Sequence, residues 1–253
     1  MDVIETLLDS MTRDAGIRQV VVGAFWTAVV LDSDPPRCGL ASMLRGKSHD
    51  TGPPIAQAGR LEDHGALELA GWLRSASTEQ ASVGMAAYNA LLEVDETACE
   101  EINAEEIILA RGAGRRVAVV GHFPFVEPVR RVAAECWVLE HQPRMGDLPA
   151  GKAGEILPRA DVVALTGTSL INHTFDDLIG CCHPEAYVVL VGASAPLSPL
   201  LFEHGVDAIC GTRVQDIPAA LQAIGQGATF RQIPGKRLLA MMRQYPRTNS
   251  GGG

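Results

Sequence analysis

Hydroxyl and amide side chains are concentrated in one short segment of the second half of the chain. Thr166-Gly167-Thr168 is followed closely by Asn172 and Thr174. Such groups, with backbone N–H groups at a helix start, suit a phosphate or a carboxylate. The alternative is that Thr168 or Ser169 only caps the helix that begins there. The expected ligand-binding residues in this half are Thr166, Gly167, Thr168, Asn172, Thr174 and Ser194.

Ionisable side chains suited to proton transfer lie at three other points. We expect His122, Glu140 and Asp147 to be catalytic, provided that they reach one substrate atom. Imidazole and carboxylate groups also bind transition metals, so a second interpretation is a metal site of His122, Glu140 and His141. No HxH, HxxxH or HExxH spacing supports that site. Unrelated loop histidines, with His173 among them, are the alternative.

These side chains follow the strands of a predicted sheet. Apolar strand segments alternate with helical segments through the second half, which predicts a doubly wound, Rossmann-like parallel sheet with helices on both faces. Ligands bind outside the carboxyl ends of such strands, so the residues above are expected along one edge. The expected strands are 116–121, 136–140, 161–166, 187–192 and 208–211, and the expected helices are 124–135, 170–179, 198–204 and 217–225.

The first half has a different pattern, which predicts a small α+β domain. A strand over 19–31 and a return strand over 37–44 flank a turn at Asp32-Ser33-Asp34-Pro35-Pro36. Helices are expected at 4–11, at 67–73 and from Thr78 to Leu91, with Thr78 as a cap.

Charge also divides the chain. Residues 1–110 have a net charge of −11 and residues 111–253 a net charge of +2, and an acidic run from Glu93 to Glu106 precedes the basic cluster at 111–116. This change predicts a boundary near 105–115, although the acids also fit one solvated helix face. The predicted domains are 1–105 and 111–232, followed by a C-terminal segment, 233–253, with a flexible tail.

Composition excludes several classes of function. An acidic chain is poorly suited to nucleic acid or an anionic membrane. The start of the chain lacks the basic residues of a signal peptide, and six scattered cysteines suggest reduced thiols, so a cytoplasmic protein is expected. Aromatic residues make up only 5% of the chain, which is too few to predict a stacking surface for bases.

The segment after the first predicted strand disfavours NAD. Glu140 lies nineteen residues after Gly121, where an acid would bind ribose hydroxyls. Gly121-His122-Phe123-Pro124, however, is not GxGxxG, because bulky side chains and a proline replace the later glycines. A pyrophosphate could not approach this turn closely, while another ribose-bearing ligand is still compatible with Glu140.

Several ordered motifs resemble one family. They begin with Gly121-His122-Phe123-Pro124 and Thr166-Gly167-Thr168 and continue through Val191-Gly192-Ala193-Ser194 and Gly211-Thr212-Arg213. Together they resemble the heavy-metal-chelation domain family of prokaryotes. The first half, with Val22-Gly23-Ala24-Phe25-Trp26, resembles that family's usual partner, a domain like the N-terminal domain of enolase.

The resemblance implies a cleft between the two domains and a role in making or handling a metal-chelating small molecule. It adds Asn89 as the ligand-binding residue of the first domain, the alternative being an amide packed at the interface. An enzyme is favoured, and a small molecule is its expected partner. A homo-oligomer is compatible with this interpretation. The cofactor is left open between none and a transition metal. The alternative is a non-catalytic protein that binds a metal or a metal chelate.

Overall fold

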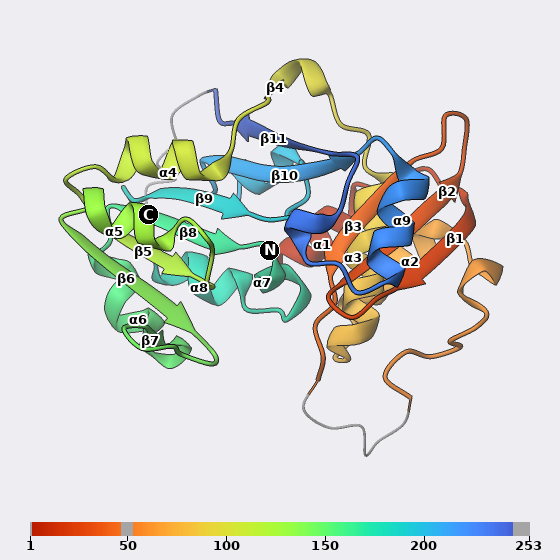
Figure 1. Ribbon diagram of the computed structural model, residues 1–253, viewed down its shortest axis with the longest axis horizontal. Helices are drawn as coiled ribbons and strands as arrows, with labels where there is room; N and C mark the ends of the chain where they lie inside the picture. The colour runs from red at the N-terminus through yellow and green to blue at the C-terminus, as the bar shows by residue number, and fades with distance from the viewer. Residues whose placement is uncertain (1, 47–52, 245–253) are drawn as a thin grey trace, which may run out of the picture.

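The computed structural model describes residues 2–46 and 53–244 of the chain. Its larger sheet, sheet B, has eight strands in the order β4-β11-β10-β9-β8-β5-β6-β7 (Figure 1). The strands from β5 to β10 are parallel to one another and follow the order of a Rossmann fold, as expected. Their bounds are β5 Arg116–Val120, β6 Glu135–Glu140, β7 Leu148–Pro149, β8 Val162–Thr166, β9 Tyr187–Val191 and β10 Ala208–Val214.

Helices cover both faces of sheet B, because its central strands bury side chains in both directions. Val117 and Val119 of β5 face α4 and α5, whereas Ala118 and Val120 belong to the core under α6, α7 and α8. The mixed α/β fold with a mostly parallel sheet is therefore confirmed. The helix bounds are α4 Ala104–Gly112, α5 Val126–Val132, α6 Ala153–Ile156, α7 Thr168–Ile171 and α8 Phe175–Cys181.

Two antiparallel strands that the sequence did not predict extend sheet B. β11, Lys236–Met242, pairs along the whole of β10, and β4, Cys99–Glu100, pairs with β11. The acidic run forms β4 and the start of α4, so its acids do lie partly on a solvated helix face.

The first half forms sheet A, which has three antiparallel strands in sequence order. The predicted strand over 19–31 is in fact a hairpin of β1, Gly16–Val22, and β2, Trp26–Asp32. It turns at Gly23, where a Cβ atom would collide with the backbone oxygen of Ile224. The return strand is β3, Cys38–Ser42.

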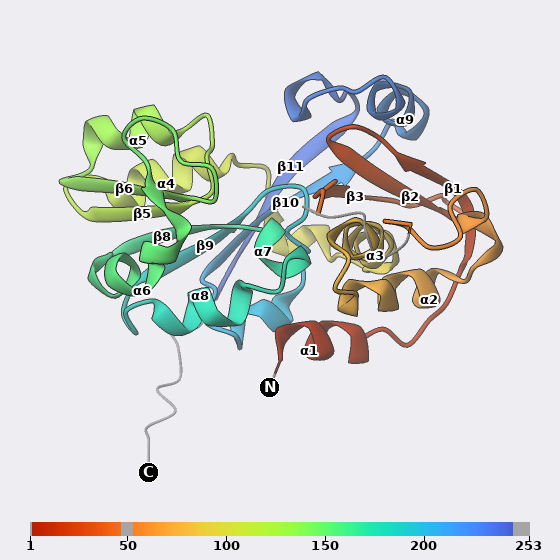
Figure 2. The ribbon, with the colours of Figure 1, turned by 90° about the horizontal axis from the view of Figure 1, so that it is seen from below.

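Sheet A lies between helices of different origin (Figure 2). On β2, Val29 and Leu31 join the core with α3, Thr78–Leu91, and α2, Ala66–Gly71. Ala28 and Val30 instead contact α9, Ile217–Gly225, which comes from the other end of the chain. α9 therefore does not cover sheet B, although it follows β10. Helix α1, Val3–Asp9, packs against the short 3-10 helix Pro199–Phe202.

Two predicted helix features differ in the structure. Ser77, rather than Thr78, caps α3, because its hydroxyl accepts a hydrogen bond from Gln80 N. The helix expected over 170–179 is divided into α7 and α8, and His173 between them has a φ of +59°, a left-handed conformation that interrupts a helix. No helix within 2–46 and 53–244 is long and apolar enough to span a membrane.

Candidate functional site

A cavity of about 520 Å³ opens where β5 and β8 end side by side, and we call it the polar cavity after the polar side chains that line part of it. The chain leaves β5 toward β6 on one side and later returns on the other side as β8, so this is the switch point at which Rossmann-like sheets bind ligands. Residues from the ends of β5, β6 and β8 and from α8 surround it. The polar residues lining it are His122, Glu140, His141, Thr166, Thr168, Asn172, Thr174 and Asp177.

His122 and Asp147 form a hydrogen-bonded pair at this cavity. His122 Nδ1 lies 3.1 Å from Asp147 Oδ2, and the Asp147 side chain is only 1% exposed. A carboxylate that binds one ring nitrogen fixes the orientation and tautomer of the imidazole. With Nδ1 bound to Asp147, Nε2 is the nitrogen of His122 that can exchange a proton with a ligand.

Asp147 is held as a carboxylate by its surroundings. Burial raises its pKa, but hydrogen bonds from Arg144 N and His122 and the charge of Arg130 outweigh burial and hold the pKa below its ordinary value. Arg144 N donates to Oδ2 at 3.1 Å, and Arg130 Nη2 lies 3.4 Å from Oδ1. Arg130, which the sequence did not single out, lies on α5 and contacts the loop that contains Asp147.

The threonine-rich segment presents hydroxyl groups beside the polar cavity. Thr166 Oγ1 and Thr168 Oγ1 are 2.9 Å apart, and Thr174 Oγ1 donates to Asn172 Oδ1 at 2.7 Å. α7 begins after Gly167 without a side-chain cap, so neither Thr168 nor Ser169 caps it. Because α7 has only four residues, we assign no anion-binding role to its N-terminus.

Three residues predicted to bind ligand make contacts that join parts of the fold. Gly167 N donates to Val191 O at 2.8 Å, and a Cβ atom at Gly167 would lie 2.5 Å from Ala195 N. Ser194 is 2% exposed, and its hydroxyl accepts a hydrogen bond from Ser42 N at 2.8 Å. Asn89 Nδ2 donates to Leu40 O at 2.9 Å and to Ala193 O at 3.2 Å. The alternative for Asn89, an amide packed between the two halves, therefore describes its contacts.

The donors proposed for a metal do not converge. Glu140 Oε2 turns back to accept a hydrogen bond from His141 N at 2.9 Å, and the His141 side chain is exposed. Across the described parts of the chain, no three His, Cys, Asp or Glu side chains are arranged to hold a metal ion. His122, Glu140 and His141 line the same cavity, but in the described structure they are not arranged to hold a metal ion together.

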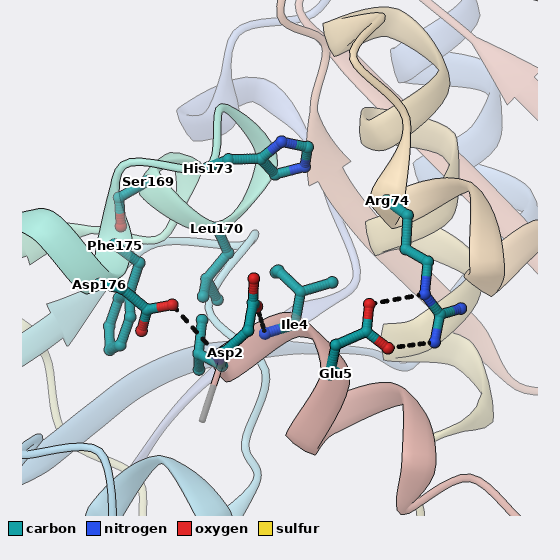
Figure 3. Close-up of a pocket in the computed structure, with 10 residues that line it drawn as sticks. Asp2, Ile4, Glu5, Arg74, Ser169, Leu170, His173, Phe175 and Asp176 are labelled. Atoms are coloured by element: carbon teal, nitrogen blue, oxygen red, sulfur yellow. Dashed lines mark hydrogen bonds and ion pairs between the residues drawn. The ribbon is translucent and has the colours of Figure 1, made fainter.

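His173, which the sequence suggested as an unrelated loop histidine, lies at a separate crevice between α1 and the α7–α8 junction (Figure 3). Its Nε2 is 2.7 Å from Leu73 O. Glu5 binds Arg74 through both carboxylate oxygens, and Asp176 accepts a hydrogen bond from Val3 N at 3.2 Å. The crevice has a volume of only about 170 Å³, so its polar groups serve to anchor α1.

A second cavity, of about 650 Å³, lies beyond His122 and Phe123, which line both cavities. The chain has six Phe, three Trp and three Tyr, and four of these rings line this one cavity. Four rings therefore gather at this one place, although the chain as a whole has few. The rings are those of Trp26, Phe123, Phe125 and Phe230. They come from distant segments, so no local spacing could have revealed them.

Comparisons with known proteins agree with this architecture. The DUF364 family, described as "Putative heavy-metal chelation", matches residues 103–243, and the DUF4213 family, with the same description, matches residues 4–92. An uncharacterized protein of Methanocaldococcus jannaschii is 30% identical over 125 residues, which are 47% of this chain and 48% of that relative. The chain thus spans about half the length of this relative.

Two solved structures share the fold over most of the chain. One, from Desulfitobacterium hafniense, is 24% identical with a TM-score of 0.79 and covers 95% of this chain and 97% of its own. The other, from Pyrococcus horikoshii, is 18% identical with a TM-score of 0.80 and covers 95% and 98%. Both are described as proteins of unknown function from the DUF364 family.

Proposed function

The chain belongs to the DUF364 heavy-metal-chelation family, and on that premise we propose that it is an enzyme that binds a small hydroxyl- or carboxylate-bearing compound in the polar cavity. The compound would be a metal-chelating molecule or a precursor of one. A chelator carries the oxygen and nitrogen groups that bind hard and borderline metal ions. These are also the groups that the threonine hydroxyls and the Asn172 amide can hydrogen-bond.

The observation that carries this proposal is the His122–Asp147 pair. A buried carboxylate on Nδ1 leaves Nε2 as a base that can remove a proton from a bound hydroxyl group, or as an acid once protonated. Glu140 lines the same cavity from the next strand and is a second group for proton transfer or for binding a hydroxyl. No step is assigned to a resident metal, because the described donors do not fit one.

The proposed setting is cytoplasmic, with a small molecule as the partner and neither nucleic acid nor a membrane involved. All six cysteines are free thiols, which fits a reducing compartment. NAD is also not proposed. A Cβ atom at Gly121 would lie 3.2 Å from the Phe123 ring, so this ring stands over the turn that a pyrophosphate would have to approach. A homo-oligomer is compatible with the proposal.

The test is to identify what copurifies with the full-length protein. Mass spectrometry of the small molecules released on denaturation, with metals quantified in parallel, should find an oxygen-rich compound near one per chain. Glu140→Gln and Thr168→Val should each reduce its occupancy about tenfold, the effect of losing a hydrogen bond to a polar ligand. Glu155→Gln is the matched control, because Glu155 is exposed, forms an ion pair with Lys152 and does not line the polar cavity.

Two results would contradict the proposal. Equal occupancy in Glu140→Gln, Thr168→Val and the wild-type protein would show that the compound does not bind in the polar cavity. A stoichiometric transition metal without any organic compound would favour the non-catalytic metal-binding alternative.

A second measurement addresses the base itself. Nitrogen NMR of His122, assigned with the His122→Gln variant, should show the proton on Nδ1, and Asp147→Asn should abolish this tautomer preference.

A further inference from the structure

The aromatic cavity, as we call the second cavity lined by Trp26, Phe123, Phe125 and Phe230, has the size of a ligand site. Its volume of about 650 Å³ lies within the range of pockets that hold small molecules and cofactors. It opens at the ends of β9 and β10 and at the start of β11, on the far side of His122 from the polar cavity. The proposed function makes no use of it.

The rings of the aromatic cavity form two groups. Trp26 and Phe230 have centroids 5.1 Å apart at an angle of 41°. Phe123 and Phe125 are stacked, with centroids 4.9 Å apart and planes inclined by only 6°. Aromatic rings stack favourably on other planar rings, offset or edge to face. A planar ligand can therefore gain contacts here that an aliphatic chain of equal area would not.

The aromatic cavity is also lined by a cationic side chain, that of Lys236. Lys236 Nζ lies 4.9 Å from the Phe230 ring centroid and donates a hydrogen bond to Ile233 O. Burial lowers the pKa of Lys236, and none of the ion pairs among the described residues includes it. An ammonium group has three donors, so Lys236 can still bind an anion. Arg231 also lines the cavity and offsets the charge of Glu105.

We propose that the aromatic cavity binds a planar aromatic carboxylate, with its ring against Phe230 and Phe123 and its carboxylate at the Lys236 ammonium group. Both halves of this ligand follow from the lining, since the rings select a planar apolar body and Lys236 selects a negative charge. The proposal goes beyond the proposed function, which concerns the polar cavity. The two can fail separately, because Glu140 and Thr168 do not line the aromatic cavity.

The test is a titration of the full-length protein with 2-naphthoate, followed by calorimetry. Three reference compounds separate the features of the ligand: 2-naphthol has the rings without the carboxylate, cyclohexanecarboxylate has the charge without the aromatic ring, and decanoate has an apolar chain. We expect saturable binding of one 2-naphthoate per chain, at least about tenfold tighter than any reference compound, which corresponds to about 1.4 kcal/mol.

Variants then assign this binding to the cavity. Lys236→Met should weaken 2-naphthoate binding about tenfold and remove the preference over 2-naphthol, whereas Lys236→Arg should keep that preference. Phe230→Leu should weaken binding about fivefold, and Phe230→Tyr, which keeps the ring, by less than twofold. Lys152→Met is the matched control outside the cavity and should leave the affinity unchanged. Circular dichroism melting checks that each variant is folded.

Several outcomes would overturn the proposal. These are equal affinity for 2-naphthoate and 2-naphthol, tighter binding of decanoate, full affinity in Lys236→Met, or the absence of binding up to about 5 mM 2-naphthoate, a concentration well above ordinary ligand affinities. Thr168→Val should leave 2-naphthoate binding intact. A polar compound that copurifies with the protein but is lost in Thr168→Val would thus support the proposed function whatever the outcome here.

Discussion

The loops that follow β5 and β8 and the loop that follows β9 leave the same edge of sheet B, yet they have opposite surroundings. His122, Thr166 and Thr168 face an open polar cavity. Residues 194–198 lie buried against the first half of the chain, with Ser194 and Ser198 each only 2% exposed. At the switch point between β5 and β8 the strand ends face the polar cavity, whereas the loop after β9 packs against sheet A.

The largest effect should come from adding a methyl group at Gly167, where the loop after β8 packs against the loop after β9. Gly167 has ordinary helical φ and ψ, so Gly167→Ala strains no backbone angle, but its methyl group would lie 2.5 Å from Ala195 N. We expect the free energy of unfolding to fall by about 3 kcal/mol. Urea denaturation measures it. Gly154→Ala, with open space around its Cβ position, is the control and should not destabilise the protein. A loss below about 1 kcal/mol would mean that the loop is not packed as described.

Removing the hydroxyl of Ser194 should have the next largest effect. Ser194→Ala leaves the Ser42 N–H group buried without its acceptor, which should cost about 2 kcal/mol. The occupancy of the copurifying compound should stay unchanged. Ser33→Ala, at an exposed turn, is the control for loss of a serine hydroxyl. If Ser194→Ala instead lost the compound and kept full stability, Ser194 would be a ligand-binding residue after all.

The opposite pattern is expected on the open side. Thr168→Val keeps the shape of the side chain and removes a hydroxyl whose hydrogen-bond partner among the described residues is Thr166 Oγ1. Unfolding free energy should change by no more than about 1 kcal/mol, while occupancy of the polar cavity falls. Thermal melting and mass spectrometry on one preparation give both readouts. A loss of stability larger than that of Ser194→Ala would reverse the comparison between the two loops.

The amino edge of sheet B provides a reference charge that lies outside both the polar and the aromatic cavity. The Arg116 guanidinium beside Asp161 lowers the pKa of that carboxyl to about 2. A lowered pKa in the folded state stabilises the protein above the unfolded pKa of about 4, and this stabilisation disappears as pH falls through about 2.

Asp161→Asn should therefore lower the unfolding free energy by no more than about 1 kcal/mol near neutral pH, as for other exposed ion pairs. The stabilities of the variant and the wild-type protein should converge as pH falls from about 4 toward about 2. Urea unfolding over this pH range measures the difference, and a difference that persists at the lowest pH would assign it to packing.

Much of sheet B follows from the sequence, because its central strands are continuous runs such as Val117-Ala118-Val119-Val120. β11 was missed, since Lys236 and Arg237 open it and interrupt the continuous apolar run that marks the central strands. The packing of α9 on sheet A could not be predicted either. An apolar helix face shows that the helix is covered, but not which of two sheets covers it.

The site divides in the same way. His122 and Asp147 are 25 residues apart, and their meeting follows from the rule that neighbouring parallel strands end at one edge. The roles of Gly167, Ser194 and Asn89 depend on where the first half of the chain lies over that edge, which no local motif encodes. The aromatic cavity depends on the same arrangement, because Trp26 reaches it from sheet A and Phe230 from the segment after α9.

Helix α9 has one further consequence, which concerns cooperativity of unfolding. The chain runs from β10 of sheet B to α9 on sheet A and then back to β11 of sheet B. A fragment that ends before residue 103 would leave Ala28, Val30 and Leu40 without the Ala220 and Ile224 side chains that cover them. The two family matches therefore divide the sequence at a place where the fold does not divide. We expect the halves to unfold together in one transition, and the isolated first half to aggregate through its uncovered sheet.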